Sequence, residues 1–306
     1  MVALREALGA KEGAIVAKAA AIAGELELVH SQTADLVPDL RDAFHRLLEQ
    51  PVKRDPGCAA KTAIATTLHR CGAYEDALFL TGVRWVQREP VWGGTVDVAC
   101  ELRSVCAMGL LRLGHPFAAS EVAELLADPE PAARAGAAHA IAYSEDARFA
   151  PLLRHKILSG DAETQVIAEC LAALLRVEGE QALEFCARVL DAADAARAEL
   201  VAMALGESRR AGALPVLRAW WERTPSSELR RTALLAIALL RTEAAHAFLL
   251  EVITTAPGHD ARDAVAALAV FRDDEALRQR VVAAARTRDD AALRAALAEL
   301  ERPRGG

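Results

Sequence analysis

The sequence predicts an all-α fold, a right-handed α-solenoid of about eight helix pairs followed by a C-terminal capping helix. Three observations carry this prediction. Segments with apolar residues at helical spacing follow one another along the chain, a motif recurs every 31 to 33 residues, and 53% of the 306 residues are hydrophobic. Because one helix pair cannot bury its apolar stripes alone, successive pairs must stack into a continuous core.

The repeat is most regular in the second half of the chain. Each block opens near Asp, Pro or Ser, which supply an N-cap oxygen or a pre-set φ for the first helical turn. The blocks begin at Asp128, Asp161, Ala193, Pro225, Pro257 and Asp289. We therefore expect one domain over residues 1–306. It comprises two longer, irregular repeats (1–88), an inter-repeat loop (89–97), regular repeats (98–288), and a capping helix with a tail (289–306).

Three segments carry a family resemblance. PAARAGAAHAIA, ALGESRRAGALPVLRAWWE and ELRRTALLAIALLRTEAAHAFLLEVI resemble HEAT-like repeats, in particular the short bacterial kind also found in phycobilin lyases. The likeness extends over roughly residues 10–300. It implies the solenoid architecture but no single activity, because HEAT arrays act as scaffolds, adaptors, lyases and DNA glycosylases. The N-terminal half also resembles bacterial HEAT-repeat proteins that have no assigned activity.

Composition and charge restrict the partners and the compartment. The net charge of −7 does not favour a polyanion such as nucleic acid. The N-terminal MVALREALGAKEG has charges where an export signal needs an apolar run, and the longest apolar run, TALLAIALL, is too short to span a membrane. The six cysteines show no close pairing, which fits a reducing compartment. We expect a cytoplasmic protein, of bacterial origin, with no membrane partner.

Motifs for catalysis or cofactor binding are missing from the sequence. His69 and Cys71 form the one close pair of zinc-ligand types, and no second pair accompanies them. No phosphate-binding loop, dinucleotide fingerprint or hydrolase signature is present. The sequence therefore predicts no catalytic residue, no cofactor and no metal, and favours a binding protein over an enzyme.

The segment Glu89–Val98 interrupts the helical pattern. Pro90 ends a helix, and Gly93 and Gly94 allow backbone angles that other residues avoid. Trp92 lies between them and has two interpretations. It plugs the gap between irregular repeats, the commoner outcome for a loop tryptophan, or it stands on the surface as the anchor of a binding site.

Residues around this loop complete the first candidate site. Asp97 and Glu101 are four residues apart, and Asp97 is expected to cap the helix that follows. Lys61 stands in a helix that otherwise consists of core residues, so we expect it to pair with Asp97 or Glu101 across the stack.

A second group of candidates follows from the usual geometry of solenoids, in which second helices line the inner face. Trp220 and Trp221 are consecutive, so only one of them can face the core, and Trp221 is retained as a possible surface aromatic. The remaining candidates of this group are Trp85, Arg88, Arg154, Arg188 and Arg218.

The function predicted from these observations is a scaffold or adaptor that binds another protein through its concave face and the 89–97 loop. Two alternatives stay open. The arginines on second helices are compatible with a DNA-binding HEAT-repeat protein, possibly a HEAT-like DNA glycosylase, although the net charge disfavours nucleic acid. The resemblance also allows a protein of the phycobilin-lyase type that binds a tetrapyrrole, although the chain has only 4 Trp and 2 Tyr.

Overall fold

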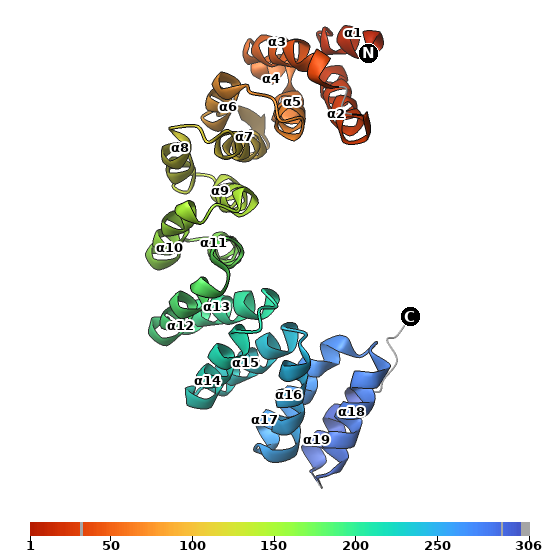
Figure 1. Cartoon of the computed structure of the whole chain (residues 1–306), viewed down its shortest axis with the longest axis vertical. Helices are drawn as coiled ribbons and strands as arrows, with labels where there is room; N and C mark the ends of the chain where they lie inside the picture. The colour runs from red at the N-terminus through yellow and green to blue at the C-terminus, as the bar shows by residue number, and fades with distance from the viewer. Residues whose placement is uncertain (31–32, 289, 301–306) are drawn as a thin grey trace. The chain divides into compact units, whose positions relative to one another are not determined.

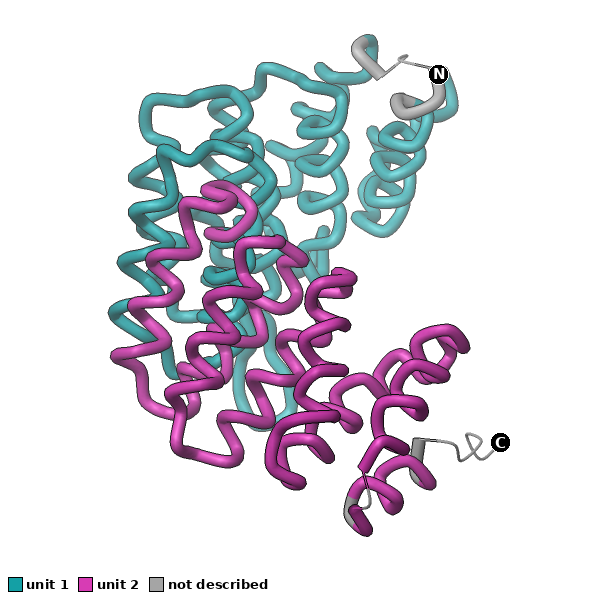
Figure 2. The backbone as a smooth tube through the Cα atoms, turned by 60° about the horizontal axis from the view of Figure 1, so that its bottom comes forward, with its two compact units in different colours: residues 1–173 teal, residues 174–306 magenta. Residues whose placement is uncertain are grey.

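The structure, a computed structural model, describes residues 1–30, 33–288 and 290–300. The chain divides into two compact units, residues 1–173 and residues 174–306 (Figure 2). Within each unit, helix follows helix along the chain, and successive helices pack as pairs (Figure 1). The predicted all-α solenoid is confirmed.

Unit 1 holds the N-terminal helix pairs and a β-hairpin. Its elements are α1 (Val2–Leu8), α2 (Gly13–His30), α3 (Val37–Leu48), α4 (Pro51–Arg54), α5 (Ala59–Arg70), α6 (Asp76–Val83), β1 (Arg88–Val91), β2 (Gly94–Asp97), α7 (Cys100–Leu113), α8 (Ala118–Leu125), α9 (Pro131–Ser144), α10 (Ala150–Ser159) and the first part of α11 (Thr164–Glu178). The helices α1 and α4 lie outside the predicted pairs.

Unit 2 contains the more regular repeats. Its elements after α11 are α12 (Ala182–Ala192), α13 (Ala195–Glu207), α14 (Ala213–Arg223), α15 (Ser227–Leu239), α16 (Glu243–Thr255), α17 (Gly258–Leu268), α18 (Glu275–Arg286) and α19 (Ala291–Leu300). Over the described residues, the pairs run from α2/α3 to α17/α18 and number eight, with α19 after them. Of the predicted cap and tail, residues 289 and 301–306 lie outside the described residues.

The two helices of each pair belong to two different rows. In unit 1 the first helices pack directly on one another, α2 on α5, α5 on α7 and α7 on α9, and in unit 2 α13, α15, α17 and α19 do the same. In unit 1 the second helices α6, α8 and α10 stand further apart (Figure 1). In unit 1 the closely packed row thus consists of first helices, whereas the prediction placed second helices on the inner face.

Small residues allow the first helices to approach so closely. Gly136 of α9 lies against Ser104 of α7, and Gly206 of α13 lies against the backbone of Ala236 in α15, leaving no room for a Cβ at either glycine. Alanine is frequent among the other buried residues of these helices, such as Ala133, Ala137, Ala138 and Ala140 of α9. The alanine-rich sequence thus determines which row is the closely packed one.

Helix starts follow the predicted capping chemistry. Pro131 occupies the first turn of α9, the Asp194 carboxylate accepts the Arg197 N–H at the start of α13, and the Ser226 hydroxyl accepts the Leu229 N–H at the start of α15. These side chains satisfy backbone donors that have no partner inside the helix. In the described part of the chain, no helix combines the length and the apolar character needed to cross a bilayer.

Candidate functional site

The segment predicted as an inter-repeat loop is a β-hairpin that emerges between α6 and α7. Strands β1 and β2 are antiparallel, with Arg88 opposite Asp97 and Val91 opposite Gly94, so Trp92 and Gly93 form a two-residue turn. Gly93 has a φ of 89°, which suits the second position of a tight turn and is costly for any other residue. The segment lies between helices as expected, but its strands were not predicted, because strands of four residues show almost no alternation.

Trp92 stands at the tip of this hairpin and is fully exposed, with 103% of its reference surface accessible. The interpretation of Trp92 as a buried plug is therefore wrong. The neighbouring Val91 and Val96 are also exposed, and the strand register places both on the same face of the hairpin. The tip thus presents a contiguous apolar surface, which we call the hairpin tip (Val91, Trp92 and Val96).

The base of the hairpin is fixed to the preceding repeat by hydrogen bonds. The buried Gln87 side chain donates to the Asp55 carbonyl at 2.8 Å and to the Glu89 carboxylate at 2.7 Å. That carboxylate also accepts the Gly57 N–H at 2.8 Å. These contacts join the start of β1 to the segment that leads into α5, so the hairpin leaves a base that is held in place.

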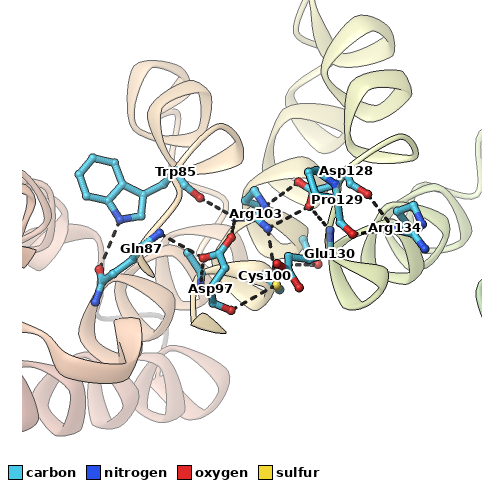
Figure 3. Close-up of polar contacts among 11 residues, drawn as sticks. Trp85, Gln87, Asp97, Cys100, Arg103, Asp128, Pro129, Glu130 and Arg134 are labelled. Carbon is cyan, nitrogen blue, oxygen red and sulfur yellow. Dashed lines mark hydrogen bonds and ion pairs between the residues drawn. The ribbon is translucent and has the colours of Figure 1, made fainter. Parts of the chain in front are cut away.

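On the other side of the base, Asp97 forms a buried ion pair with Arg103 of α7 (Figure 3). Arg103 Nη1 lies 2.7 Å from the Asp97 carboxylate and 2.8 Å from the Trp85 carbonyl, which it also binds. Arg103 Nε reaches the Asp128 carboxylate of the next repeat at 3.1 Å. A single guanidinium, 2% exposed, thereby joins the hairpin to two successive repeats.

Asp97 is not the N-cap of α7, contrary to the prediction. Ala99 occupies that position, and the Asp97 carboxylate accepts the N–H groups of Gln87 and Ala99 at 3.1 and 3.0 Å. Burial by itself raises the pKa of Asp97, but the hydrogen bonds from Ala99, Arg103 and Gln87 outweigh it, so the pKa lies below its usual value. Asp97 is therefore a charged structural group at neutral pH.

Lys61 pairs with neither Asp97 nor Glu101. Its ammonium lies 2.8 Å from the Asp55 carboxylate, with both side chains almost fully buried. The ammonium is also 5.8 Å from the centroid of the half-buried Trp85 ring, whose Nε1 donates to the Gln87 side chain. Lys61 and Trp85 thus belong to the base of the hairpin, where they contribute to packing.

The same arrangement of an acid and a base recurs along unit 1. In each of three successive repeats an Asp stands six residues before a basic residue that bonds to its side chain or carbonyl. The pairs are Asp55 with Lys61, Asp97 with Arg103, and Asp128 with Arg134. Arg134 also forms a two-fold bond with Asp161 of the following repeat, at 2.7 Å for both contacts. We call this series the Asp–Arg ladder; its spacing is visible in the sequence, although the prediction overlooked it.

The remaining residues of the loop candidate are exposed. Arg88 lies in β1, not on a second helix, and Glu101 lies in the first turn of α7. Among the described residues, neither side chain has a hydrogen-bond or ion-pair partner. Arg88 and Glu101 thus add accessible charges of opposite sign to the surroundings of the hairpin tip.

The arginine candidates on second helices are divided between the two units. Arg154 of α10 is half-buried, whereas Arg188 of α12 and Arg218 of α14 are exposed in unit 2. Arg218 pairs with Glu222 at 2.9 Å and lies over the Phe248 ring. These positions belong to the second-helix row, so they do not line the closely packed face.

Trp220 and Trp221 are consecutive on a helix, and only one of them is in the core. Trp220 is buried, and Trp221 is half-buried beneath the Arg230 guanidinium, whose carbon lies 4.3 Å from the ring centroid. Phe248 meets the same ring edge-on at 5.7 Å. Trp221 is thus covered by its own chain, in contrast to Trp92.

The turn of the hairpin offers a first test of its conformation. Gly93→Ala is expected to destabilise the hairpin by about 1 kcal/mol, because an L residue is strained at a positive φ. Gly94→Ala is the matched control, since Gly94 has no positive φ and open space around it. Hydrogen–deuterium exchange of residues 88–97 should be faster in the first variant; equal exchange in both would contradict the turn geometry.

Metal-ligand clusters and reactive thiols were sought among the residues with a described structure. The described residues contain no cluster of three or more His, Cys, Asp or Glu side chains that is suited to a metal ion. Burial raises the pKa of the Cys58 and Cys170 thiols to about 12, so neither supplies a thiolate nucleophile near neutral pH. The surface that stands out is the hairpin tip.

Part of the chain matches a known repeat family. The sequence model for HEAT repeats matches residues 182–269. No curated protein matches the sequence. Two solved structures are similar at 16% identity. One is the complex of CpcE and CpcF of phycocyanin lyase from Nostoc sp. PCC7120 (85% of this chain, 94% of that chain, TM-score 0.37), and the other is an engineered protein (97% of both chains, TM-score 0.34).

At these TM-scores, neither likeness indicates what this chain binds. The HEAT match lies within unit 2, and the helix pairs of both units follow one after another in the manner of such repeats. Residues 182–269 are thus similar to HEAT repeats.

Proposed function

We propose that the protein is a non-enzymatic scaffold or adaptor that binds another protein through the hairpin tip. One observation carries this proposal: a fully exposed tryptophan at the end of a hairpin whose base is held by buried hydrogen bonds and an ion pair. An exposed Trp flanked by two valines exposes apolar surface to water, and a partner that covers it gains the corresponding free energy.

The rigid base adds to the expected affinity. Binding surfaces lose less conformational entropy when their anchor is already held in place. The hairpin is held on both sides, through Gln87 and Glu89 to the preceding repeat and through Asp97 to Arg103 of the following one. Tryptophan is also among the side chains that contribute most to protein–protein binding.

The nucleic-acid alternative receives little support from the arginines. Arg84 pairs with the buried Glu121, Arg218 with Glu222, and Arg223 with Asp191, so each has an acidic partner in its own chain. Phosphate binding needs cations that are not already neutralised, and the net charge of the chain is −7. Trp220 is buried and Trp221 is covered by Arg230, so this pair offers little surface to a DNA base or a tetrapyrrole.

Replacing Trp92 by alanine tests the proposal. Trp92→Ala is expected to weaken partner binding at least about 30-fold, the effect of a 2 kcal/mol hot spot, without changing the stability of the fold. Affinity capture with the full-length protein, followed by quantitative mass spectrometry, compares wild type with this variant.

Tyr74→Ala is the matched control, because Tyr74 is another exposed aromatic residue of unit 1, at 75%. Proteins retained by wild type and by Tyr74→Ala but lost with Trp92→Ala support the proposal. If every captured protein is retained by Trp92→Ala, the hairpin tip is not the binding site.

A further inference from the structure

A groove runs beside the base of the hairpin on the closely packed row of unit 1. It has a volume of about 380 Å³ and lies over α5, between α2 and the start of α7. Ala21, Ala59, Ala63 and Val98 form part of its wall, together with Gly57, which is hydrogen-bonded to Glu89 of the hairpin. The groove and the hairpin are thus adjacent parts of one surface.

The threonines of the groove do not offer free hydroxyl donors. Thr62 donates to the Cys58 carbonyl at 2.8 Å, Thr66 donates to the Thr62 carbonyl at 2.9 Å, and Thr67 donates to the Ala20 carbonyl at 2.7 Å. With these donors used internally, the threonines contribute only acceptor oxygens, and the wall combines them with small apolar side chains and the charged Arg70 and Glu101. A ligand that needs hydroxyl donors from the wall is therefore poorly matched to this groove.

Two charged side chains of opposite sign line the groove. Glu101 lies near the hairpin end, in the first turn of α7, and Arg70 is the last residue of α5. Both side chains are exposed, and among the described residues neither has a hydrogen-bond or ion-pair partner. At a rise of 1.5 Å per residue, the helix from Ala59 to Arg70 is about 16 Å long, or three turns.

We propose that this groove binds an amphipathic helix of the partner protein. The helix places small apolar side chains against α5, a basic side chain beside Glu101 and, about three turns away, an acidic side chain beside Arg70. Trp92 packs over the end of the helix that lies towards the hairpin. This inference rests on the proposed function, and it specifies what kind of segment is bound.

The wall favours a helix over an extended peptide. A helix satisfies its own backbone N–H and C=O groups, whereas an extended peptide needs partners for them. The threonine hydroxyls of the groove already donate within the chain, so they offer no donor to the carbonyl groups of an extended peptide. Small residues such as Ala59 and Ala63 also allow a second helix to approach closely.

The experiment uses a displayed library of 20-residue peptides, selected on the full-length protein. Enriched peptides are synthesised, and their affinities are measured by fluorescence anisotropy. We expect peptides with an i, i+3, i+4, i+7 apolar pattern whose binding falls at least about tenfold with Ala63→Arg, which fills the groove. Ala63→Ser is the matched control and should bind as wild type; circular dichroism verifies that both variants fold.

Charge exchange tests the orientation. A peptide in which the basic residue is replaced by Glu should bind wild type more weakly, and Glu101→Lys should restore its affinity. Failure of this restoration overturns the assigned charge order, and enrichment of proline-containing or strand-patterned peptides overturns the helical occupant.

The variants also separate the two proposals. Peptides that lose affinity with Trp92→Ala but not with Ala63→Arg overturn the groove and uphold the hairpin tip. Peptides that depend only on Ala63 uphold the groove and overturn the role of the hairpin. Peptides that depend on neither residue, or a selection without enrichment, overturn both.

Discussion

Arg103→Met is expected to reduce the free energy of unfolding of unit 1 by about 3–5 kcal/mol. The guanidinium is 2% exposed and compensates two carboxylates, Asp97 at 2.7 Å and Asp128 at 3.1 Å. Methionine fills a similar volume but leaves both negative charges without their cation in a desolvated site. The ion pair itself need not contribute this much, because the cost comes from leaving a buried charge unpaired.

Urea unfolding of the full chain, with hydrogen exchange to identify unit 1, measures this effect. Arg148→Met is the matched control, because Arg148 forms a similar pair with Asp146 but its side chain is 85% exposed. Arg148→Met should reduce the free energy of unfolding by less than about 1 kcal/mol. Adding Asp97→Asn to Arg103→Met should recover part of the loss. Equal costs for the two methionine variants would show that the buried pair is not important for stability.

His69 is expected to make unit 1 less stable at mildly acidic pH. The ring is 7% exposed, and burial, together with the charges of Arg112 and Arg70, lowers its pKa from 6.5 to about 4. The unfolded chain therefore binds a proton more readily than the folded one. This stability is fully present above pH 6.5 and decreases as the pH falls towards 4, and the loss amounts to about 2 kcal/mol at pH 5.

His69→Phe should remove this part of the pH dependence and keep the edge-on ring contact with Tyr143. Neither ring nitrogen of His69 has a hydrogen-bond partner among the described residues, so the variant loses no such bond. Urea unfolding at pH 7.5 and pH 5 measures the difference, with the exposed His45→Phe as the control. If His69→Phe and His45→Phe lose the same stability between the two pH values as wild type, His69 is not the group that titrates.

The architecture was predictable because it depends on patterns that extend over many residues. Helical spacing of apolar side chains, and a repeat of 31 to 33 residues, indicate stacked helix pairs even where a single boundary is uncertain. The early helices show the limit of this approach. Helix α6 ends at Val83, so Trp85 and Arg88 are not on a second helix, because the chain turns into the hairpin before the apolar pattern changes.

The candidate site was predictable only in part. Pro90 and Gly93 marked the right place, but whether Trp92 is buried depends on how the hairpin is supported, and this support comes from residues far apart in sequence. Gln87 bonds to Asp55, 32 residues away, and Arg103 was overlooked because an arginine on a helix is usually exposed. Contacts of this kind can be identified only when the packing of the repeats is known.

The support of the hairpin has a mechanical consequence. Its two strands begin and end in the polar contacts between consecutive repeats, where Gln87 bonds to Asp55 on one side and Asp97 pairs with Arg103 on the other. A ligand that immobilises the tip therefore opposes the separation of these repeats. By the same coupling free energy, a mutation that loosens the repeats weakens binding of the ligand. Binding at the hairpin tip is thus coupled to the stability of the contact between the two repeats.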